Sequence, residues 1–440
     1  MDFNDTPSDA AYRAQARAWL ATAAAEYREP PAHPQSRADM VAASRAWQKT
    51  KHAAGYTGIT WPKAMGGQGL SPMHSIIFNQ EQSRYHAPTE LFAIGLGMCL
   101  PTVFTHGSPA LIERYVAKAL AGDEVWCQLF SEPSAGSDLA GIRTKAVRDG
   151  DGPDADWIID GQKVWTTNAH LSDFGIIVTR TDPSKPKHKG LTMFVVDMHA
   201  PGVEARPLKQ MSGGSDFNEV FFTGVRVPDS HRVGAEGDGW KVSLTTLMNE
   251  RLAVGGKPSH APGYRTLMDL AARVDTDDGP AIAARDVRQR IAASYIADEG
   301  IRLTQLRALS ALAKGEAPGP EQSISKVVVA KTMQEMAAFA MNLTEASGFL
   351  TGAAGGGGAG RGTANSGEGG AAGAITGGAI SDAGDTDLHK LQGSYMAAAG
   401  LRIAGGTDEI LRNIIAERVL GLPGDMRPDK DTPFNEIRAA

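Results

Sequence analysis

The chain has 440 residues, of which 42% are hydrophobic and 21% charged, and 50 acidic against 44 basic side chains give a net charge of −6 at pH 7. This composition is typical of a globular protein with a large core, and the mild acidity argues against a nucleic-acid-binding protein. The two cysteines, Cys99 and Cys127, form no C-x-x-C pair, which argues against a thiolate metal site and a disulfide framework and favours a reducing cytoplasm. The polar N-terminus predicts no signal peptide, and the absence of a long apolar stretch predicts no membrane span.

Helices are expected over most of residues 1–125. Two Ala-rich stretches, Ala10–Tyr27 and Ala38–Gly55, place large apolar residues at helical spacing. The glycines and the proline of Gly58–Leu70 then predict a loop. This first region is therefore predicted to be a helical domain.

The character of the sequence changes near Trp126, and up to residue 235 short apolar runs alternate with turn residues. Such runs are typical of strands. The four clearest are Trp157–Gly161, Phe174–Arg180, Leu191–Asp197 and Val220–Val227.

The loop Asp182–Gly190 between two of these runs is polar and carries Lys185, Lys187 and Lys189. A charged loop of this kind is usually a solvated tip, which is the interpretation that we favour. A contact between these lysines and a phosphate is the alternative.

Helical spacing returns after Gly239 and continues through Val287–Ala313 and Ser323–Ala346. The order of helices, strands and helices favours an α+β fold, with a β domain between helical parts, over a parallel α/β sheet. We therefore expect three domains, comprising residues 1–125, 126–235 and 236–440.

Residues 352–378 interrupt the last of these domains, and 13 of these 27 residues are glycine. We interpret the segment as a flexible insertion. It contains a formal G-x-G-x-x-G, at Gly355, Gly357 and Gly360, but no strand precedes it. A dinucleotide-binding interpretation therefore lacks its structural context.

Four segments carry residues suited to chemistry. They are Gln128–Asp138, with three serines, one glycine and a proline; Gly161–Ala169, with a tryptophan followed by two threonines; Met248–Arg251 within a helix; and Leu401–Ile410, with a Gly-Gly-Thr-Asp helix start. An aromatic ring and neighbouring hydroxyls can flank a flat cofactor, and free N–H groups at a helix start can polarise a carbonyl. Each segment also has an ordinary structural explanation: a turn, a buried tryptophan, a surface charge and a capped helix.

Taken together and in this order, the segments resemble the acyl-CoA dehydrogenase family. Ser131-Glu132-Pro133-x-Ala135-Gly136-Ser137-Asp138 resembles the first signature of the family, and Trp165-Thr166-Thr167-Asn168 its flavin-flanking strand. The segment from Val225 to Gly239 is similar to its exit from the β domain. Gly406-Thr407-x-Glu409-Ile410, followed by Ile415-Ala416-Glu417-Arg418, resembles its C-terminal signature.

The resemblance implies an N-terminal helical domain, a middle β-barrel or sandwich and a C-terminal four-helix bundle, with FAD between the last two. It implies no metal ion. The residues that it assigns to the flavin or its cofactor tail are Gln128, Phe130, Ser131, Gly136, Ser137, Trp165, Thr167, Thr407 and Glu409. The residues that it places near the acyl-CoA substrate are Ser137, Met248, Asn249 and Arg251.

The catalytic base departs from the commonest pattern of the family, in which a glutamate precedes the Gly-Thr of the fourth segment. Gly405 stands there and has no side chain, whereas Glu250-Arg251 matches the base of the isovaleryl- and long-chain types. We therefore expect Glu250 to take the α-proton, with Arg251 setting the charge around it and the Gly405 N–H holding the thioester oxygen. A carboxylate buried by substrate has a raised pKa, which suits a general base near neutral pH.

The resemblance further implies a role in fatty acid β-oxidation, an electron-transfer flavoprotein as electron acceptor and a homodimer or homotetramer. Two alternatives stay open: a non-catalytic or FAD-poor partner subunit of a heteromeric dehydrogenase, and an acyl-CoA oxidase. The first is favoured by two departures from the family pattern. No Arg-x-x-Phe-Gly is evident between residues 270 and 300, and the Gly-rich run replaces a Gln-x-x-Gly-Gly element.

Overall fold

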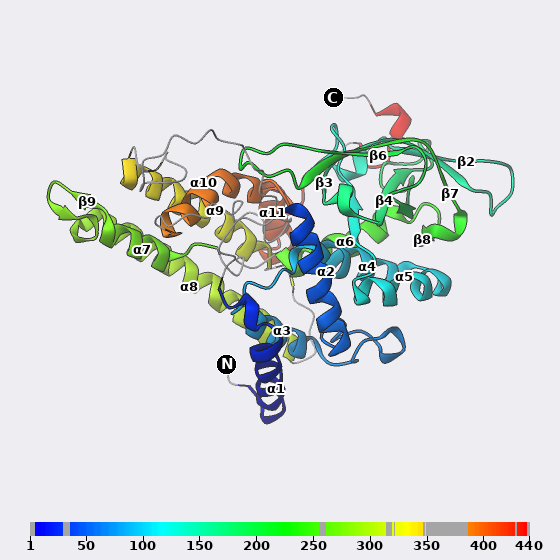
Figure 1. The fold of residues 1–440 in the computed structure, drawn as a ribbon. Coiled ribbons are helices and arrows are strands. Elements are labelled where there is room, and N and C mark those ends of the chain that lie inside the picture. Colours follow the sequence, from blue (N-terminus) through cyan, green and yellow to red (C-terminus); the bar gives the residue numbers. More distant parts are fainter. Residues whose placement is uncertain are drawn as a thin grey trace, which may run out of the picture.

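A computed structural model describes residues 5–29, 36–254, 261–313, 319–320, 322–345, 348, 386–426 and 429–437. Along the sequence, helices precede and follow one large sheet, as expected for the predicted α+β fold. Figure 1 shows the C-terminal helices α7 to α10 grouped to one side of this sheet. The Gly-rich segment 352–378, including its formal G-x-G-x-x-G, falls outside the described residues.

The N-terminal region consists of helices α1 (Pro7–Ala23), α2 (Arg37–Ala53), α3 (Pro72–Gln82), α4 (Leu100–His106) and α5 (Pro109–Ala121). Three of these helices begin after a Thr or Ser. Its hydroxyl accepts the backbone N–H of the residue three positions later, which would otherwise be a free donor in the first turn. The two predicted Ala-rich helices are thus confirmed, each with shifted ends. Their apolar faces meet at a cluster that includes Leu20, Trp47 and Phe78.

The middle region is an eight-stranded sheet with the order β6-β7-β3-β2-β4-β5-β8, and β1 pairs in parallel with β4. The four predicted strands are confirmed. The strand bounds are β1 Trp126–Leu129, β2 Lys145–Arg148, β3 Trp157–Thr167, β4 Phe174–Arg180, β5 Leu191–Asp197, β6 Val203–Pro207, β7 Phe217–Val227 and β8 Arg232–Val233.

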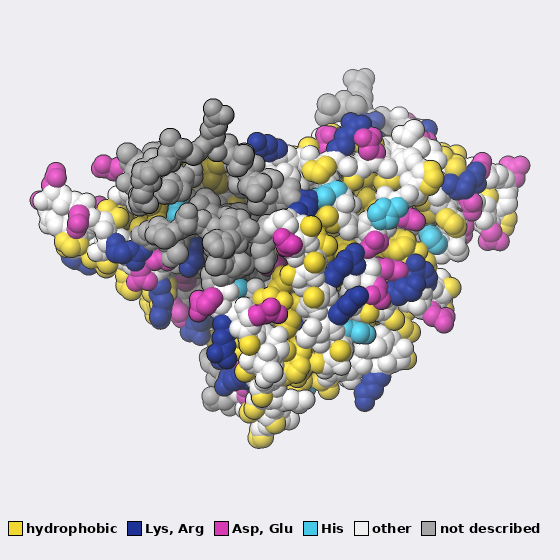
Figure 2. Space-filling view, in the orientation of Figure 1, with side chains coloured by type: hydrophobic (Ala, Val, Ile, Leu, Met, Phe, Trp, Pro, Cys, Tyr) yellow, Lys and Arg dark blue, Asp and Glu magenta, His cyan; other side chains and the backbone are white. Residues whose placement is uncertain are grey.

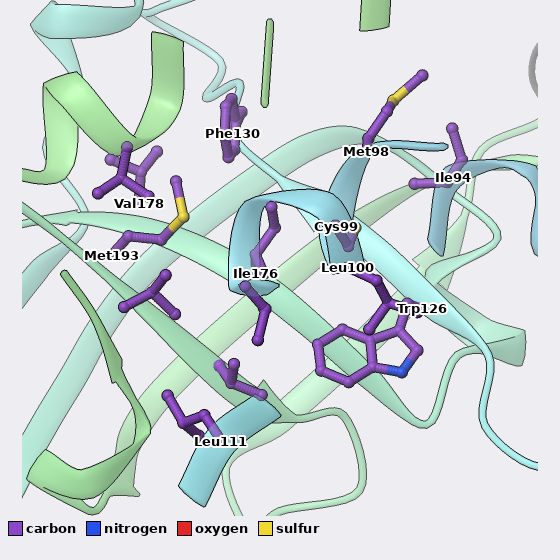
Figure 3. Packing of buried hydrophobic residues seen from close by; sticks show 14 of the residues in the cluster. Ile94, Met98, Cys99, Leu100, Leu111, Trp126, Phe130, Ile176, Val178 and Met193 are labelled. Atoms are coloured by element: carbon purple, nitrogen blue, oxygen red, sulfur yellow. The ribbon is translucent and has the colours of Figure 1, made fainter. Parts of the chain in front are cut away.

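The central residues of strands β4 and β5 are apolar on both faces, because both faces of the sheet are covered there. Ile176 and Val178 of β4 point into a cluster shared with α4 and α5, whereas Ile177 between them points into a cluster on the other face. Figure 3 shows the first cluster, in which Leu100 from α4 lies near Ile176. Continuous apolar strands of this kind are typical of a sheet buried on both sides.

The C-terminal region contains helices α6 (Gly239–Val254), α7 (Tyr264–Arg273), α8 (Arg285–Ala313), α9 (Gln322–Thr344), α10 (Thr386–Leu401) and α11 (Asp408–Ile414). Helices α7 to α10 share a core that includes Leu267, Ile291, Met336 and Leu391. The two long helices predicted here are confirmed as α8 and α9. A short hairpin of β9 (Asp275–Thr276) and β10 (Gly279–Pro280) connects α7 to α8.

Residues 429–437 return to the middle region and lie beside the sheet (Figure 1). The Phe434 N–H donates to the Lys185 carbonyl over 2.9 Å, and the Phe434 ring lies 3.7 Å from the Arg180 guanidinium carbon. Lys187 pairs with Asp138 at 3.1 Å and with Asp429 at 2.9 Å, and its side chain is only 16% exposed. The expected solvated loop tip is therefore wrong for Lys187, because the returning chain covers it.

Acidic and basic side chains are interspersed over the described residues on the face shown in Figure 2. Within the described residues, no helix is long and apolar enough to cross a membrane. The same residues contain no group of three or more His, Cys, Asp or Glu side chains that could hold a metal ion.

Candidate active site

The first candidate segment leaves β1 and turns sharply. Gln128 is half-buried, Phe130 is buried in the cluster beneath the helices, and Glu132 and Ala135 exchange two backbone hydrogen bonds of 3.0 Å. Beyond this turn, a Cβ added at Gly136 would meet no heavy atom within 4 Å. Gly136 and the exposed Ser137 after it therefore border open space.

The second candidate segment lies at the end of β3, where pairing with β7 shifts register between Lys163 and Thr166. This bulge pushes Trp165 outward: its φ is +60° and its side chain is 61% exposed, packed edge-on against Phe217 at 5.9 Å. Asn168 also has a positive φ, of +53°. Such backbone conformations cost about 1–3 kcal/mol each for residues with side chains and are concentrated at functional sites. We call residues 164–168 the arch.

Direct hydrogen bonds join these two segments. The Val164 N–H donates to the Ser131 carbonyl over 2.9 Å, and the fully buried Lys163 ammonium donates to the Phe130 carbonyl over 3.0 Å and to the Glu132 carboxylate over 2.9 Å. The structure thus joins the two chain segments that carry the flavin-side residues predicted from the two signatures. Ser131 and Thr167 lie on chain segments that are fixed to each other through the interior of the sheet.

Burial and pairing shift the pKa values of Lys163 and Glu132 in the interior of the protein. Burial lowers the pKa of Lys163 to about 8, against the opposing attraction of Glu132. Burial alone would raise the pKa of Glu132, but Lys163 and backbone hydrogen bonds from Arg143 and Thr144 hold it below its usual range. Both groups are charged at neutral pH, so each depends on the other.

Helix α6 begins against the sheet and carries the third candidate segment. Val242 and Leu247 pack in the same cluster as Phe130, and the Thr246 hydroxyl lies 2.9 Å from that of Thr102 on α4. Met248 is exposed and Asn249 half-buried. Glu250 and Arg251 belong to the helix, one turn after Thr246 and Leu247, but their side chains lie outside the described residues.

The fourth candidate segment is a turn between α10 and α11. Gly405 and Gly406 have φ values of +62° and +88°, and the Thr407 hydroxyl accepts the Ile410 N–H, which confirms the predicted N-cap. The buried Asp408 pairs with Arg402 at 2.7 Å, and Glu409 is exposed. Among the described residues, the Gly405 N–H finds no acceptor.

The fourth segment is tied to its own bundle. The Lys326 ammonium of α9 donates to the Gly406 carbonyl over 2.7 Å. In the part of the chain that the structure describes, no hydrogen bond or ion pair links residues 405–409 to the middle region. The structure therefore joins the first two segments directly and leaves the fourth as a separate element.

Several polar residues that the sequence did not single out lie directly behind the arch. Lys163, Asp216 and Asn218 are all buried, and His170 is half-buried beside Asn218. Two of them have a signal in the sequence, which is a polar side chain in phase with the buried apolar positions of its strand. Lys163 is in phase with Trp157 and Ile159 in β3. Asn218 is in phase with Val220 and Phe222 in β7.

The residues present fit a flavin on three observations. A large aromatic ring is held in solvent by a strained backbone at Trp165, Gly136 borders open space, and the buried Thr166 hydroxyl has no hydrogen-bond partner. A flat heteroaromatic ring with polar edges would cover the exposed Trp165 side chain and could accept hydrogen bonds from the backbone and hydroxyl groups near Gly136. The arrangement is thus suited to hold such a ring above the arch.

Comparisons with known proteins agree along nearly the whole chain. Family profiles described as the N-terminal, middle and C-terminal domains of acyl-CoA dehydrogenase match residues 6–123, 127–225 and 237–420. The acyl-CoA dehydrogenase IpdE1 of Mycobacterium tuberculosis is 35% identical over 94% of this chain and 98% of its own length. The acyl-CoA dehydrogenase FadE34 of the same organism is 35% identical over 86% of this chain but only 46% of its own length. A solved structure described as the Tcur3481-Tcur3483 steroid ACAD is 26% identical, with a TM-score of 0.71 over 97% of this chain and 100% of that one.

Proposed function

Because this chain belongs to the acyl-CoA dehydrogenase family of FAD-dependent oxidoreductases, we propose that it oxidises a CoA thioester to its α,β-unsaturated form. The single observation that carries this proposal is the arch. Its strained backbone holds the Trp165 ring in solvent, and its Val164 N–H is bonded to Ser131, in the segment that continues to the open Gly136. That arrangement suits the residues that the family uses around its flavin.

The flavin side of the site is built by the middle region. A bound FAD would supply the acceptor for the hydride of the β-carbon. Trp165 would flank its ring, Thr167 would hydrogen-bond the ring edge, and Ser131 and Ser137 would offer hydroxyl groups. Gln128, Phe130 and Gly136 would line the same part of the site, and Thr407 and Glu409 would hold the phosphate and adenine end.

Glu250 is the proposed general base. It takes the α-proton of the thioester, and Arg251 sets the charge around its carboxylate. Met248 and Asn249, on the preceding positions of α6, line the substrate. The first turns of α6 pack on the cluster that contains Phe130, so the helix is anchored to the flavin side of the site.

Gly405 is proposed to stabilise the enolate-like oxygen that forms as the α-proton leaves. Its N–H has no acceptor among the described residues, and its φ of +62° suits glycine. A donor aimed at developing negative charge is worth about 10²–10³-fold in rate.

The substrate is proposed to be an acyl-CoA, and the electron acceptor an electron-transfer flavoprotein. A ring-containing, steroid-derived acyl group is the first class to examine, because the structural relative at 26% identity is described as a steroid ACAD. Straight-chain fatty acyl-CoA thioesters, as in fatty acid β-oxidation, are the second class.

The assembly is proposed to be a homodimer or homotetramer, with a heteromer as the second candidate. Two observations favour the second. The same structural relative is described by the names of two proteins, and the start of α8 lacks the Arg-x-x-Phe-Gly that the family uses across subunits. In a heteromer, this chain would supply Glu250 and the arch while another chain supplied the missing half of the FAD site.

The experiment is to express the chain alone, measure its mass in solution and its visible spectrum with added FAD, and then add steroid-ring and straight-chain CoA thioesters anaerobically. An oligomer that binds FAD and is bleached by one thioester class supports the homo-oligomeric dehydrogenase. A chain that binds FAD only when co-expressed with a second acyl-CoA dehydrogenase chain supports the heteromer. Bound FAD that no thioester bleaches would contradict the proposed reaction.

A further inference from the structure

The arch cannot be held by the sheet alone. Its register shift removes regular pairing at Val164 and Trp165, and pairing with β7 resumes only for Thr166 and Thr167 at the end of the ladder. The Val164 N–H is held by Ser131 instead. The other end of the arch, at Thr167 and the left-handed Asn168, needs a second anchor because strained backbone persists only where its surroundings fix it.

Asn218 supplies that anchor. Its side chain is 0% exposed, and its Nδ2 donates to the Thr166 carbonyl over 2.9 Å and to the Asp216 carbonyl over 3.0 Å. Its Oδ1 lies 2.7 Å from His170 Nδ1. The amide group therefore uses both N–H donors on the Thr166 and Asp216 carbonyls and its oxygen on the His170 ring.

The same group of residues fixes Asn168. The Asn168 N–H donates to the Asp216 carbonyl over 2.8 Å, and the Ser172 hydroxyl donates to the Asn168 carbonyl over 2.9 Å. The Asp216 carbonyl thus accepts from Asn218 and from Asn168. This shared acceptor couples the start of β7 to the end of the arch.

The two carbonyls fix the orientation of the amide, because only its N–H groups can donate to them, and His170 completes the arrangement. Burial, followed by the positive charge of Arg37, lowers the pKa of His170, so its ring is neutral at pH 7. A neutral ring that carries its proton on Nδ1 donates to Asn218 Oδ1, and this leaves both Asn218 N–H groups for the two carbonyls. A flipped amide would instead set its N–H groups against that donor.

We propose that Asn218 is a positioning residue that fixes the arch, and through it the Trp165 ring and the Thr167 hydroxyl, against the flavin. The inference rests on the proposed function, since it concerns the FAD site of that function. Asn218 touches neither cofactor nor substrate; it acts through Thr166 and Asp216. A shift of the arch would change how the flavin is held without removing any group that contacts it.

The test replaces Asn218→Asp, which keeps the shape of the side chain but removes both N–H donors. The matched control is Thr179→Val on β4 of the same sheet, away from the arch. It removes a buried hydroxyl that donates to the Thr192 carbonyl over 3.1 Å. FAD affinity, the visible spectrum and reduction potential of the bound flavin, and kcat and KM are measured for both variants and the unaltered chain in its FAD-binding assembly.

We expect Asn218→Asp to weaken FAD binding by about tenfold or more, as the loss of one to two net hydrogen bonds would, and to shift the flavin spectrum and potential. We also expect kcat to fall more than KM changes, whereas Thr179→Val should leave the flavin properties unaltered. His170→Ala, which removes only the partner of Oδ1 at a half-buried position, should change the flavin in the same direction by less. This second variant decides the matter where Asn218→Asp fails to fold.

Failure of the inference differs from failure of the proposed function. An unaltered chain that binds no FAD, alone or with a partner, would overturn the proposed function and the inference with it. An unaltered chain that binds FAD, with Asn218→Asp or His170→Ala indistinguishable from Thr179→Val in flavin affinity, spectrum and potential, would overturn the positioning role alone.

Discussion

The two sides of the candidate site are built differently. On the middle-region side, the Val164 N–H joins the arch to Ser131 of the first signature, the buried Lys163 donates to Glu132 and to the Phe130 carbonyl, and Asn218 donates to the Thr166 carbonyl. On the bundle side, the turn at Gly405 and Gly406 has left-handed backbone and an N–H without an acceptor among the described residues. The middle-region side is thus fixed by internal hydrogen bonds, whereas the bundle side, although tied to Lys326 and capped by Thr407, leaves the Gly405 N–H without an acceptor among the described residues.

The largest expected effect comes from the bundle side. Glu250→Gln should lower kcat by about 10²–10⁴-fold, because a positioned general base contributes that much, while FAD binding stays within the range of the unaltered protein. Steady-state kinetics with a thioester that bleaches the flavin measure this change. Glu335→Gln, at a half-exposed carboxylate of α9 that lies 3.7 Å from Lys331, is the matched control and should leave kcat unaltered.

On the middle-region side, loss of the Lys163–Glu132 ion pair should lower the free energy of unfolding. Lys163→Met leaves the Glu132 carboxylate buried without its ion pair, which costs about 3–5 kcal/mol of the free energy of unfolding. Urea denaturation measures the loss. The double variant Lys163→Met with Glu132→Gln should recover part of it, and a double variant as unstable as the sum of the two single variants would contradict the pairing.

Asp216 gives the middle side a pH dependence. Burial raises the pKa of this carboxyl to about 6 from an ordinary 3.8, so the folded protein holds its proton more tightly than the unfolded chain does. The group therefore contributes stability that is fully present below about pH 4 and is lost as pH rises through about 6, with a total of about 3 kcal/mol. Asp216→Asn should flatten the free energy of unfolding over this window, which urea denaturation of the variant and the unaltered chain at several pH values measures.

The smallest expected effect lies at the helix start on the bundle side. Thr407→Ala removes the hydroxyl that accepts the Ile410 N–H over 3.2 Å, which should cost about 1 kcal/mol and loosen the Gly405 turn. Thermal denaturation of the FAD-loaded protein measures this. Thr407→Ser keeps the acceptor and should behave as the unaltered chain, so equal losses in both variants would show that the cap is not the cause.

The sequence predicted what depends on local pattern. The strands Phe174–Arg180 and Leu191–Asp197 were predicted with the observed bounds because their apolar runs end at turn residues. The cap at Thr407 was predicted from the Gly-Gly-Thr-Asp start alone. The residues of the first two signatures were predicted to share a site, and the structure joins their segments directly.

The rest depends on contacts between distant parts of the chain. The exposure of Trp165 follows from the register of β3 against a strand that begins about 50 residues later, and a buried tryptophan is the commoner outcome for such a pattern. Asn218 and Asp216 contact the arch only because β7 pairs with β3, and the local sequence does not show this pairing. Lys187 was expected to be solvated because the return of residues 429–437 to the sheet has no local signal.

The central claim is that Glu250 takes the α-proton of a CoA thioester beside a flavin. The most direct test is to incubate the FAD-loaded protein anaerobically in D₂O with a thioester that bleaches it, and to follow deuterium incorporation at the α-carbon by mass spectrometry. Deuterium exchange and flavin bleaching in the unaltered protein, with loss of both in FAD-loaded Glu250→Gln, is the predicted result. Exchange at an unaltered rate in Glu250→Gln would show that another group is the base and would contradict the account.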